Sequence, residues 1–263
     1  MPALRPNLAT MDTAAAPLRD TPQLKRAAWI AFGFVALLWL IKFIELGSTG
    51  SFSWLGVRPR EWEGLLGVLT APLVHGSFEH LFMNSMPLFV LLTLALFQYP
   101  RGSRRAIPWI WLVGGLGLWV IGRASWHIGA SGLTHGLMFF LFGMGLLRRD
   151  RGATVIAMVV FFLYGSMVVT ILPREAGVSW EAHLGGAFAG ILAAFFWQRL
   201  DPAAAEPKPS WELEEENATA PDETYEPPRP DHVPVIWHRT ETPRGVVIHF
   251  PVRRRRDDGE SLH

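Results

Sequence analysis

Cysteine is missing from all 263 positions of the chain. Disulfide bonds, thiolate nucleophiles and cysteine-bound zinc or iron–sulfur sites are therefore excluded. The absent residue says nothing about the redox compartment. The formal net charge of +1 is also uninformative, because acidic and basic residues are segregated along the chain rather than balanced locally.

Several motifs of soluble hydrolases are absent as well. No His-Glu-x-x-His occurs, so a zincin-like metalloprotease is not supported. The stretch from Gly129 to Leu133 has leucine where the Gly-x-Ser-x-Gly elbow requires its last glycine, so an α/β-hydrolase is not supported either. Aspartate is missing between Asp20 and Asp150 and between Asp150 and Asp201, which leaves no pair for an aspartyl dyad in the apolar middle of the chain.

Long apolar runs are what the sequence has instead. A membrane-spanning helix needs roughly 20 apolar residues. Six segments qualify, namely 27–46, 80–97, 106–121, 131–147, 153–172 and 180–200. The first is too long for a cleavable signal and lacks a small-x-small pattern at its end. We therefore predict an all-α membrane protein, with six transmembrane helices in a domain over residues 25–200 and flexible cytoplasmic termini.

The charges of the short loops predict the orientation, because lysine and arginine favour the cytoplasmic side. They cluster before the first segment, between the second and third, and between the fourth and fifth. Two loops of the opposite side carry only Arg123 and Arg174. This bias places both termini in the cytoplasm. Together with the lack of a targeting peptide, it favours a bacterial inner membrane.

The two ends of the chain differ in composition from the middle. Residues 1–24 are predicted to be a flexible arm, and residues 201–263 a charged, proline-rich tail for which disorder is the default. Within the tail, 233–237 and 245–252 alternate weakly and could form a small hairpin. The arginines of 253–256 could contact anionic lipid, although a solvated charge run is the more common interpretation.

Polar residues in the predicted segments converge on one side of the membrane. Segments 80–97, 131–147 and 180–200 all start at the extracytoplasmic face. His80 and Asn84 lie in the first turns of 80–97. Ser131 opens 131–147, and His183 lies in the first turn of 180–200. Polar residues within a membrane are expensive and are functional candidates by default. Their common depth makes a shared site the simplest interpretation.

Each of these residues also has a structural interpretation. His80 and Asn84 are four apart on one helix face and could supply neutral donors to an oxyanion hole, or could simply tie helices together. Ser131, between Gly129 and Gly132, could be a nucleophile beside the free N–H groups of a first helical turn. Taken alone, it would be interpreted as an N-cap serine.

His183 is the candidate base. Gly186 and Gly190 follow it at a spacing that allows close helix packing, and the segment of Ser131 carries small residues at matching positions. Such packing could bring the imidazole to the serine hydroxyl, which is a weak nucleophile until a base takes its proton. Asp150 falls at the opposite end of its segment, so a Ser-His-Asp triad cannot be assembled. Packing would then orient His183, with Glu181 or Glu79 as optional partners.

Over roughly residues 54–200 the chain resembles a rhomboid protease. Each matching motif is weak by itself, but their order, spacing and predicted depth are specific. The matching motifs are Gly56-Val-Arg-Pro-Arg60, His75 with His80-x-x-x-Asn84, Gly129-Ala-Ser131-Gly132, and Ser179-Trp-Glu-Ala-His183 with Gly186 and Gly190.

The resemblance implies a six-helix rhomboid-like bundle that hydrolyses peptide bonds in or near the transmembrane segments of membrane-protein substrates, without metal or cofactor. It maps the nucleophile to Ser131, the base to His183, and the oxyanion hole to His80, Asn84 and the region of Ser131. The family commonly has an aromatic residue four positions after the serine, stacked on the imidazole. That position here is His135, a departure that leaves the pH profile open.

Other interpretations remain open. His75 and His127 flank the site and are expected to be local hydrogen-bonders. A non-catalytic rhomboid-like protein that binds and escorts membrane proteins is the main alternative function, although such a protein would be expected to lack the nucleophile or base. A small transporter is a weaker alternative function, because the polar cluster lies at one face of the membrane only.

Lys42 and Glu45 are interpreted as an ion pair near the end of the first segment. No nucleic-acid partner is expected.

Overall fold

The computed structural model describes residues 20–174, 177–203, 211–212 and 215, and helices are the regular elements of this part of the chain. The α-helices are α1 (Thr21–Leu46), α2 (Gly67–Thr70), α3 (Phe78–Gln98), α4 (Pro100–Ile121), α5 (Ser131–Arg148), α6 (Arg151–Tyr164) and α7 (Trp180–Trp197). Short 3-10 helices are η1 (Phe52–Leu55), η2 (Trp62–Leu65), η3 (Ala71–Leu73) and η4 (Gly165–Ile171). The predicted all-α class is confirmed for the described residues.

Local sequence signals mark where helices begin. Asp20, Ser77 and Asp150 each accept a hydrogen bond from the backbone N–H three residues on, at 3.1, 3.0 and 2.9 Å respectively. Such N-caps satisfy N–H groups that have no intrahelical partner. Pro100 cannot continue α3, because it lacks an N–H, and it opens α4 instead.

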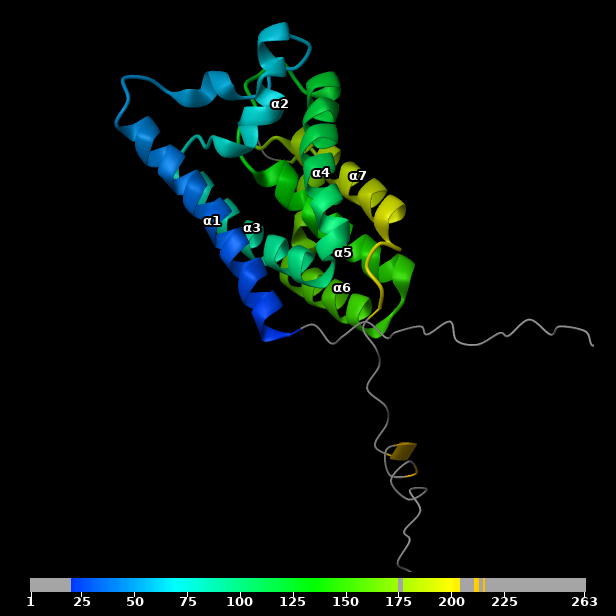
Figure 1. Ribbon diagram of the computed structural model, residues 1–263. Helices are drawn as coiled ribbons and strands as arrows, with labels where there is room; N and C mark the ends of the chain where they lie inside the picture. The colour runs from blue at the N-terminus through cyan, green and yellow to red at the C-terminus, as the bar shows by residue number, and fades with distance from the viewer. Residues whose placement is uncertain (1–19, 175–176, 204–210, 213–214, 216–263) are drawn as a thin grey trace, which may run out of the picture. The chain divides into compact units, whose positions relative to one another are not determined.

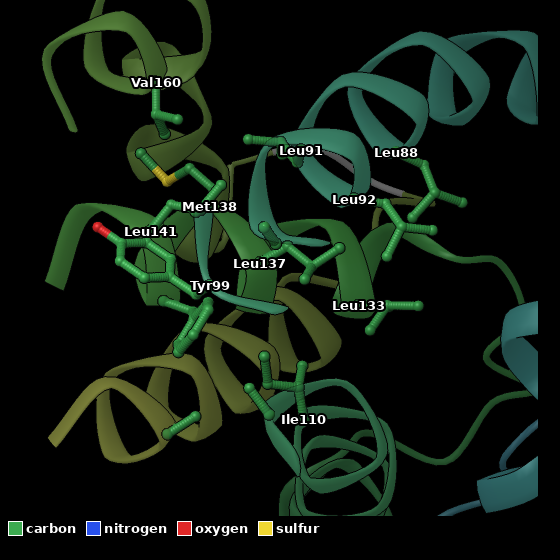
Figure 2. Packing of buried hydrophobic residues seen from close by; sticks show 14 of the residues in the cluster. Leu88, Leu91, Leu92, Tyr99, Ile110, Leu133, Leu137, Met138, Leu141 and Val160 are labelled. Carbon is green, nitrogen blue, oxygen red and sulfur yellow. The ribbon is translucent and has the colours of Figure 1, made fainter. Parts of the chain in front are cut away.

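Helix α5 is the centre of the bundle. It packs against α3, α4, α6 and α7, whereas α1 packs mainly against α3 (Figure 1). Buried apolar side chains from α5 and its neighbours form a core (Figure 2). Leu137 and Leu141 of α5 are fully buried there with Leu88 of α3 and Ile110 of α4. The site-bearing helix is therefore held by neighbours on most of its surface.

The contact between α5 and α7 brings two backbones together. A Cβ atom on Gly186 would overlap the carbonyl oxygen of Gly132, and one on Gly190 would overlap that of Gly136. Only glycine permits such an approach, as in other small-residue helix contacts of membrane proteins. The close packing expected between these two segments is present.

Three of the described helices are long and apolar enough to span a membrane. They are Thr21–Leu46, Phe78–Gln98 and the continuous stretch Arg151–Ile171 of α6 and η4. The other predicted segments are helical too, as α4, α5 and α7. Only 17% of the apolar window of α1 and 11% of that of α6 and η4 is buried, so these outer helices present apolar sides to their surroundings. A helix enclosed by protein, such as α5, has less need of a uniformly apolar surface. The count of six spans stays a prediction.

Asp201 was assigned to the predicted tail, but it is 2% exposed. Its carboxylate accepts the N–H groups of Arg101 and Gly102 at 2.9 and 2.7 Å, and so caps the start of α4. Its carbonyl oxygen accepts a hydrogen bond from the guanidinium of Arg148. Residues 1–19, the possible hairpin of 233–237 and 245–252, and the arginines of 253–256 lie outside the described residues.

The cap formed by Asp201 gives a stability prediction. Asp201→Ala leaves two N–H groups at the start of α4 without their acceptor and should lower the free energy of unfolding by about 1–2 kcal/mol. Thermal unfolding in detergent micelles measures the loss. Glu61→Ala is the control, because its carboxylate pairs with Arg58 at 2.9 Å where both side chains are about 40% exposed. Exposed ion pairs contribute little to the free energy of unfolding. An equal loss of stability in both variants would therefore contradict the role of Asp201 as the cap of α4.

Candidate active site

Ser131 and His183 meet at the contact between α5 and α7. Ser131 is the first residue of α5, and His183 lies in the first turn of α7, which Ser179 caps. The Nε2 atom of His183 lies 3.0 Å from the Oγ atom of Ser131. His183 is 7% exposed. Two residues separated by 52 positions in sequence are thus in direct hydrogen-bond contact.

A backbone carbonyl holds the other side of the His183 ring. Nδ1 lies 2.9 Å from the carbonyl oxygen of Thr170. A carbonyl only accepts, so Nδ1 carries the proton and Nε2 is left to accept from the Ser131 hydroxyl. Thr170 lies in η4, where the chain leaves the α-helical path of α6. Sequence analysis missed this partner and expected packing, with Glu181 or Glu79 as optional partners, because every residue has a carbonyl and no side chain marks the one that is used.

His135 stacks on His183, as expected for its position. Their ring centroids are 3.9 Å apart and the planes differ by 10°. His135 Nδ1 lies 2.7 Å from the carbonyl oxygen of Ser131, and Nε2 lies 2.8 Å from Oγ1 of Thr170. A histidine here therefore does more than stack. It joins the backbone of α5 to η4 through two hydrogen bonds that a phenyl ring could not make.

His80 and Asn84 line the same cavity as Ser131, His135 and His183, whose volume is about 890 Å³. Asn84 Nδ2 donates to the carbonyl oxygen of His80 at 2.9 Å and has a second hydrogen to offer. The structure thus brings together all four residues of the predicted cluster.

Gly129 adopts a left-handed conformation, with φ of +111°. A Cβ atom there would lie 2.6 Å from Cε1 of His80, closer than side chains tolerate. Both constraints require glycine. The turn before Ser131 is therefore shaped to lie directly against the His80 ring.

The loops on either side of the site are tied together. His127 forms an antiparallel bridge with Val57, hydrogen-bonds Ser179 through Nδ1 at 2.6 Å, and contacts the Arg123 carbonyl through Nε2 at 3.0 Å. Burial lowers the pKa of His127, which favours the neutral ring in this network. Glu181 is 2% exposed and pairs with Arg123 at 3.0 Å, so it does not orient a histidine.

His75 supports the turn before Ser131 from the other side. It is 2% exposed, and its Nε2 atom accepts the N–H of Ala130 at 3.3 Å. Its ring meets that of His80 edge-on, with centroids 5.1 Å apart. Burial, with the nearby His80 and Lys42, lowers the pKa of His75 to about 3. The neutral ring is the form that can accept the Ala130 N–H.

Comparisons with known proteins agree with this architecture. Residues 62–199 match the family profile described as Rhomboid domain. An uncharacterized protein of Mycobacterium tuberculosis (strain H37Rv) is 40% identical over 195 residues, covering 66% of this chain and 79% of that protein. An uncharacterized protein of Mycobacterium leprae (strain TN) is 35% identical over 194 residues, covering 67% and 75%. YdcA of Bacillus subtilis (strain 168), named as a candidate rhomboid protease, is 28% identical over 176 residues, covering 61% and 82%.

The low pKa of His75 predicts how stability depends on pH. Between about pH 3 and the ordinary histidine pKa of ~6.5, the unfolded chain binds a proton that the folded protein excludes. The stabilisation is therefore complete above pH 6.5 and is lost as the pH falls toward 3. Unfolding in detergent at pH 7, 6 and 5 should show a steeper decline for the wild type than for His75→Gln, which does not titrate but keeps an acceptor. An equal decline of stability with falling pH in the two proteins would contradict the low pKa of His75.

Proposed function

The chain belongs to the rhomboid family, and on that premise we propose that it is an intramembrane serine endopeptidase with Ser131 as nucleophile and His183 as base. The observation that carries the proposal is the 3.0 Å contact between Ser131 Oγ and His183 Nε2 inside a cavity that His80 and Asn84 also line. A serine hydroxyl needs such a base to become nucleophilic.

The hydrogen bond of His183 to the Thr170 carbonyl supports the role of a base. In the proposed first step, Ser131 Oγ attacks the carbonyl carbon of the scissile peptide while its proton passes to His183 Nε2. The resulting imidazolium carries both N–H groups. Its Nδ1–H stays bonded to the Thr170 oxygen at 2.9 Å, which stabilises the positive charge without a carboxylate.

The second half of the reaction returns the proton. His183 gives it to the leaving nitrogen as the peptide bond breaks, and an acyl-enzyme forms on Ser131. A water molecule then attacks the ester, with His183 again accepting a proton and finally restoring the serine hydroxyl. His135, stacked on the imidazole and bonded at both ends, keeps the ring from turning between these steps.

Three kinds of donor are available for the negative charge that develops on the substrate oxygen. Asn84 has one amide hydrogen free beyond its bond to the His80 carbonyl. His80 presents its ring beside Gly129. The N–H of Ser131 opens α5, where the first residues have no intrahelical acceptor. Donors placed in this way typically account for a large part of catalysis by serine hydrolases.

Membrane proteins are the proposed substrates, cleaved in or near their transmembrane segments. The apolar outer helices support a site within the span of a bilayer, and we propose that water and an unwound peptide reach it through the cavity. We propose that the cavity opens to the extracytoplasmic side of a bacterial inner membrane, with six spans and both termini in the cytoplasm. The loop arginines support this orientation.

Replacement of the nucleophile is the direct test. Ser131→Ala should abolish cleavage of single-span substrates in proteoliposomes, and should also abolish labelling by a fluorophosphonate probe, because it removes the hydroxyl that contacts His183 Nε2. Membrane insertion and thermal unfolding should match the wild type. Cleavage retained by the variant would contradict the assignment. A wild type that binds substrates but neither cleaves them nor labels would favour the escort function.

The oxyanion role of Asn84 predicts a partial loss. Asn84→Ala should lower kcat by about 10²–10³-fold, because one donor to the transition state is removed. Thr93→Ala is the matched control, since Thr93 is a buried polar residue of the same helix that also bonds the carbonyl four residues back, at 2.7 Å. It does not line the cavity. Equal kcat values for the two variants would contradict the role.

A further inference from the structure

Lys42 and Glu45 form the predicted ion pair near the end of α1, with Nζ 2.8 Å from Oε2. The two side chains are only 12% and 10% exposed. A partly buried ion pair in a membrane helix is costly, and such residues usually have a specific task. Neither lies in the cavity that holds Ser131.

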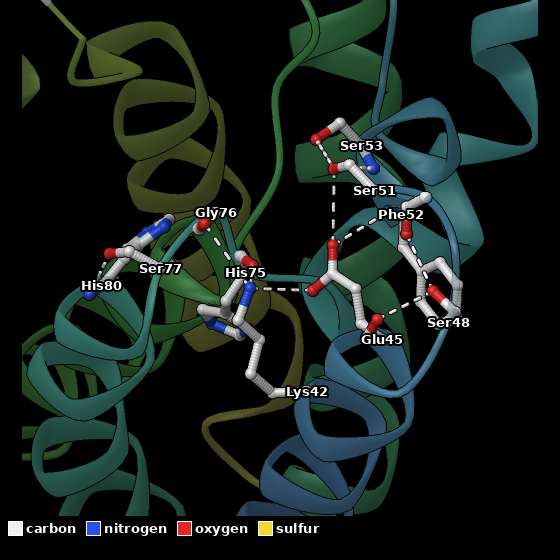
Figure 3. A network of polar contacts seen from close by, with 11 residues as sticks. Lys42, Glu45, Ser48, Ser51, Phe52, Ser53, His75, Gly76, Ser77 and His80 are labelled. Atoms are coloured by element: carbon white, nitrogen blue, oxygen red, sulfur yellow. Dashed lines mark hydrogen bonds and ion pairs between the residues drawn. The ribbon is translucent and has the colours of Figure 1, made fainter.

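The ammonium group has further partners outside α1. Its Nζ donates to the carbonyl oxygens of His75 and Gly76, at 2.9 and 3.4 Å (Figure 3). It also lies 5.8 Å from the centroid of the Phe78 ring. The three hydrogens of the ammonium thus match three acceptors, two of which belong to the turn between η3 and α3.

Glu45 extends the same network to the other side. Its Oε1 atom accepts the N–H of Phe52 at 2.8 Å and lies 3.4 Å from the Ser51 hydroxyl (Figure 3). The carboxylate therefore both pairs with Lys42 and anchors the start of η1. The ion pair joins the end of α1, the first loop and the turn before α3 at one point.

The turn that Lys42 holds carries one histidine of the site region and leads into α3, which carries a second. His75 lies within the turn, and its ring accepts the Ala130 N–H next to Ser131. His80 lies in the first turn of α3, with its backbone N–H capped by Ser77 and its ring edge-on to His75. A displacement of the His75–Gly76 backbone would therefore reach both the Ser131 turn and the His80 ring.

We propose that Lys42 is a positioning residue for the oxyanion side of the site, acting through the His75–Gly76 turn. The inference rests on the proposed protease function and adds a residue of the first membrane helix to it. Lys42 touches neither substrate nor Ser131. It holds the backbone from which His75 and His80 reach the turn before Ser131, where small displacements of groups that contact the transition state cost large factors in rate.

The test replaces the ion pair without leaving a lone buried charge. In the full-length protein, Lys42→Met/Glu45→Gln should lower kcat by about 10–10²-fold with KM changed less than about threefold, because the donors move while substrate binding persists. Lys42→Arg, which keeps a charged donor, should recover part of the loss. Ser85→Ala is the matched control, because it removes the 3.0 Å hydrogen bond from Trp39, which joins α1 to α3 away from the His75–Gly76 turn.

A second readout does not depend on cleavage. Hydrogen exchange of the backbone amides in 74–80 and 128–132 should quicken in the double variant and stay unchanged in Ser85→Ala. Unchanged exchange in the double variant, unchanged kcat, or equal kcat losses in the double variant and Ser85→Ala would each overturn the proposal. Failure of the wild type to cleave or to label at Ser131 would instead overturn the protease function, while the exchange data would still decide whether Lys42 holds the turn.

Discussion

The backbone contact between α5 and α7 is the constraint on which the candidate site depends. Gly132 and Gly186 let the two helices approach until no side-chain atom fits between them. Ser131 and His183 each lie within the first turn of their helix, so this approach sets their 3.0 Å separation. A larger residue at Gly186 would separate the helices, and the Ser131 hydroxyl would lose contact with the imidazole of His183 even though both residues were present.

A second constraint is that polar side chains packed among apolar helices need hydrogen-bond partners from the protein itself. The His183 ring is held at both nitrogens, by Ser131 and by the Thr170 carbonyl. The His135 ring is also held at both, and Lys42 uses its hydrogens on a carboxylate and two carbonyls. Most of these acceptors are backbone oxygens. Backbone carbonyls are neutral acceptors, and burying them costs less free energy than burying a further charged carboxylate.

The 3-10 segment η4 shows why a helix end can matter as much as a side chain. Thr170 is the next-to-last residue of η4, where a carbonyl has no partner within the helix, and its carbonyl oxygen faces His183. The Thr170 hydroxyl at the same time lies 2.8 Å from His135. One residue of irregular backbone thus holds both stacked rings, in the place where soluble serine hydrolases use an aspartate.

Much of this protein follows from its sequence alone. The apolar runs 80–97, 131–147 and 180–200 predict helices close to α3, α5 and α7, because the hydrophobic pattern is a local signal, whereas α1 and α4 begin six residues before their predicted segments, at Thr21 and Pro100. The common predicted depth of Ser131 and His183 and the absence of aspartate indicated a Ser-His pair as the candidate site. Only the tertiary structure decided the rest. Thr170 contributes its backbone carbonyl, Asp201 caps backbone N–H groups of α4, and Lys42 donates to two backbone carbonyls. Every residue carries such backbone groups, so only the packing of distant segments shows which of them are used.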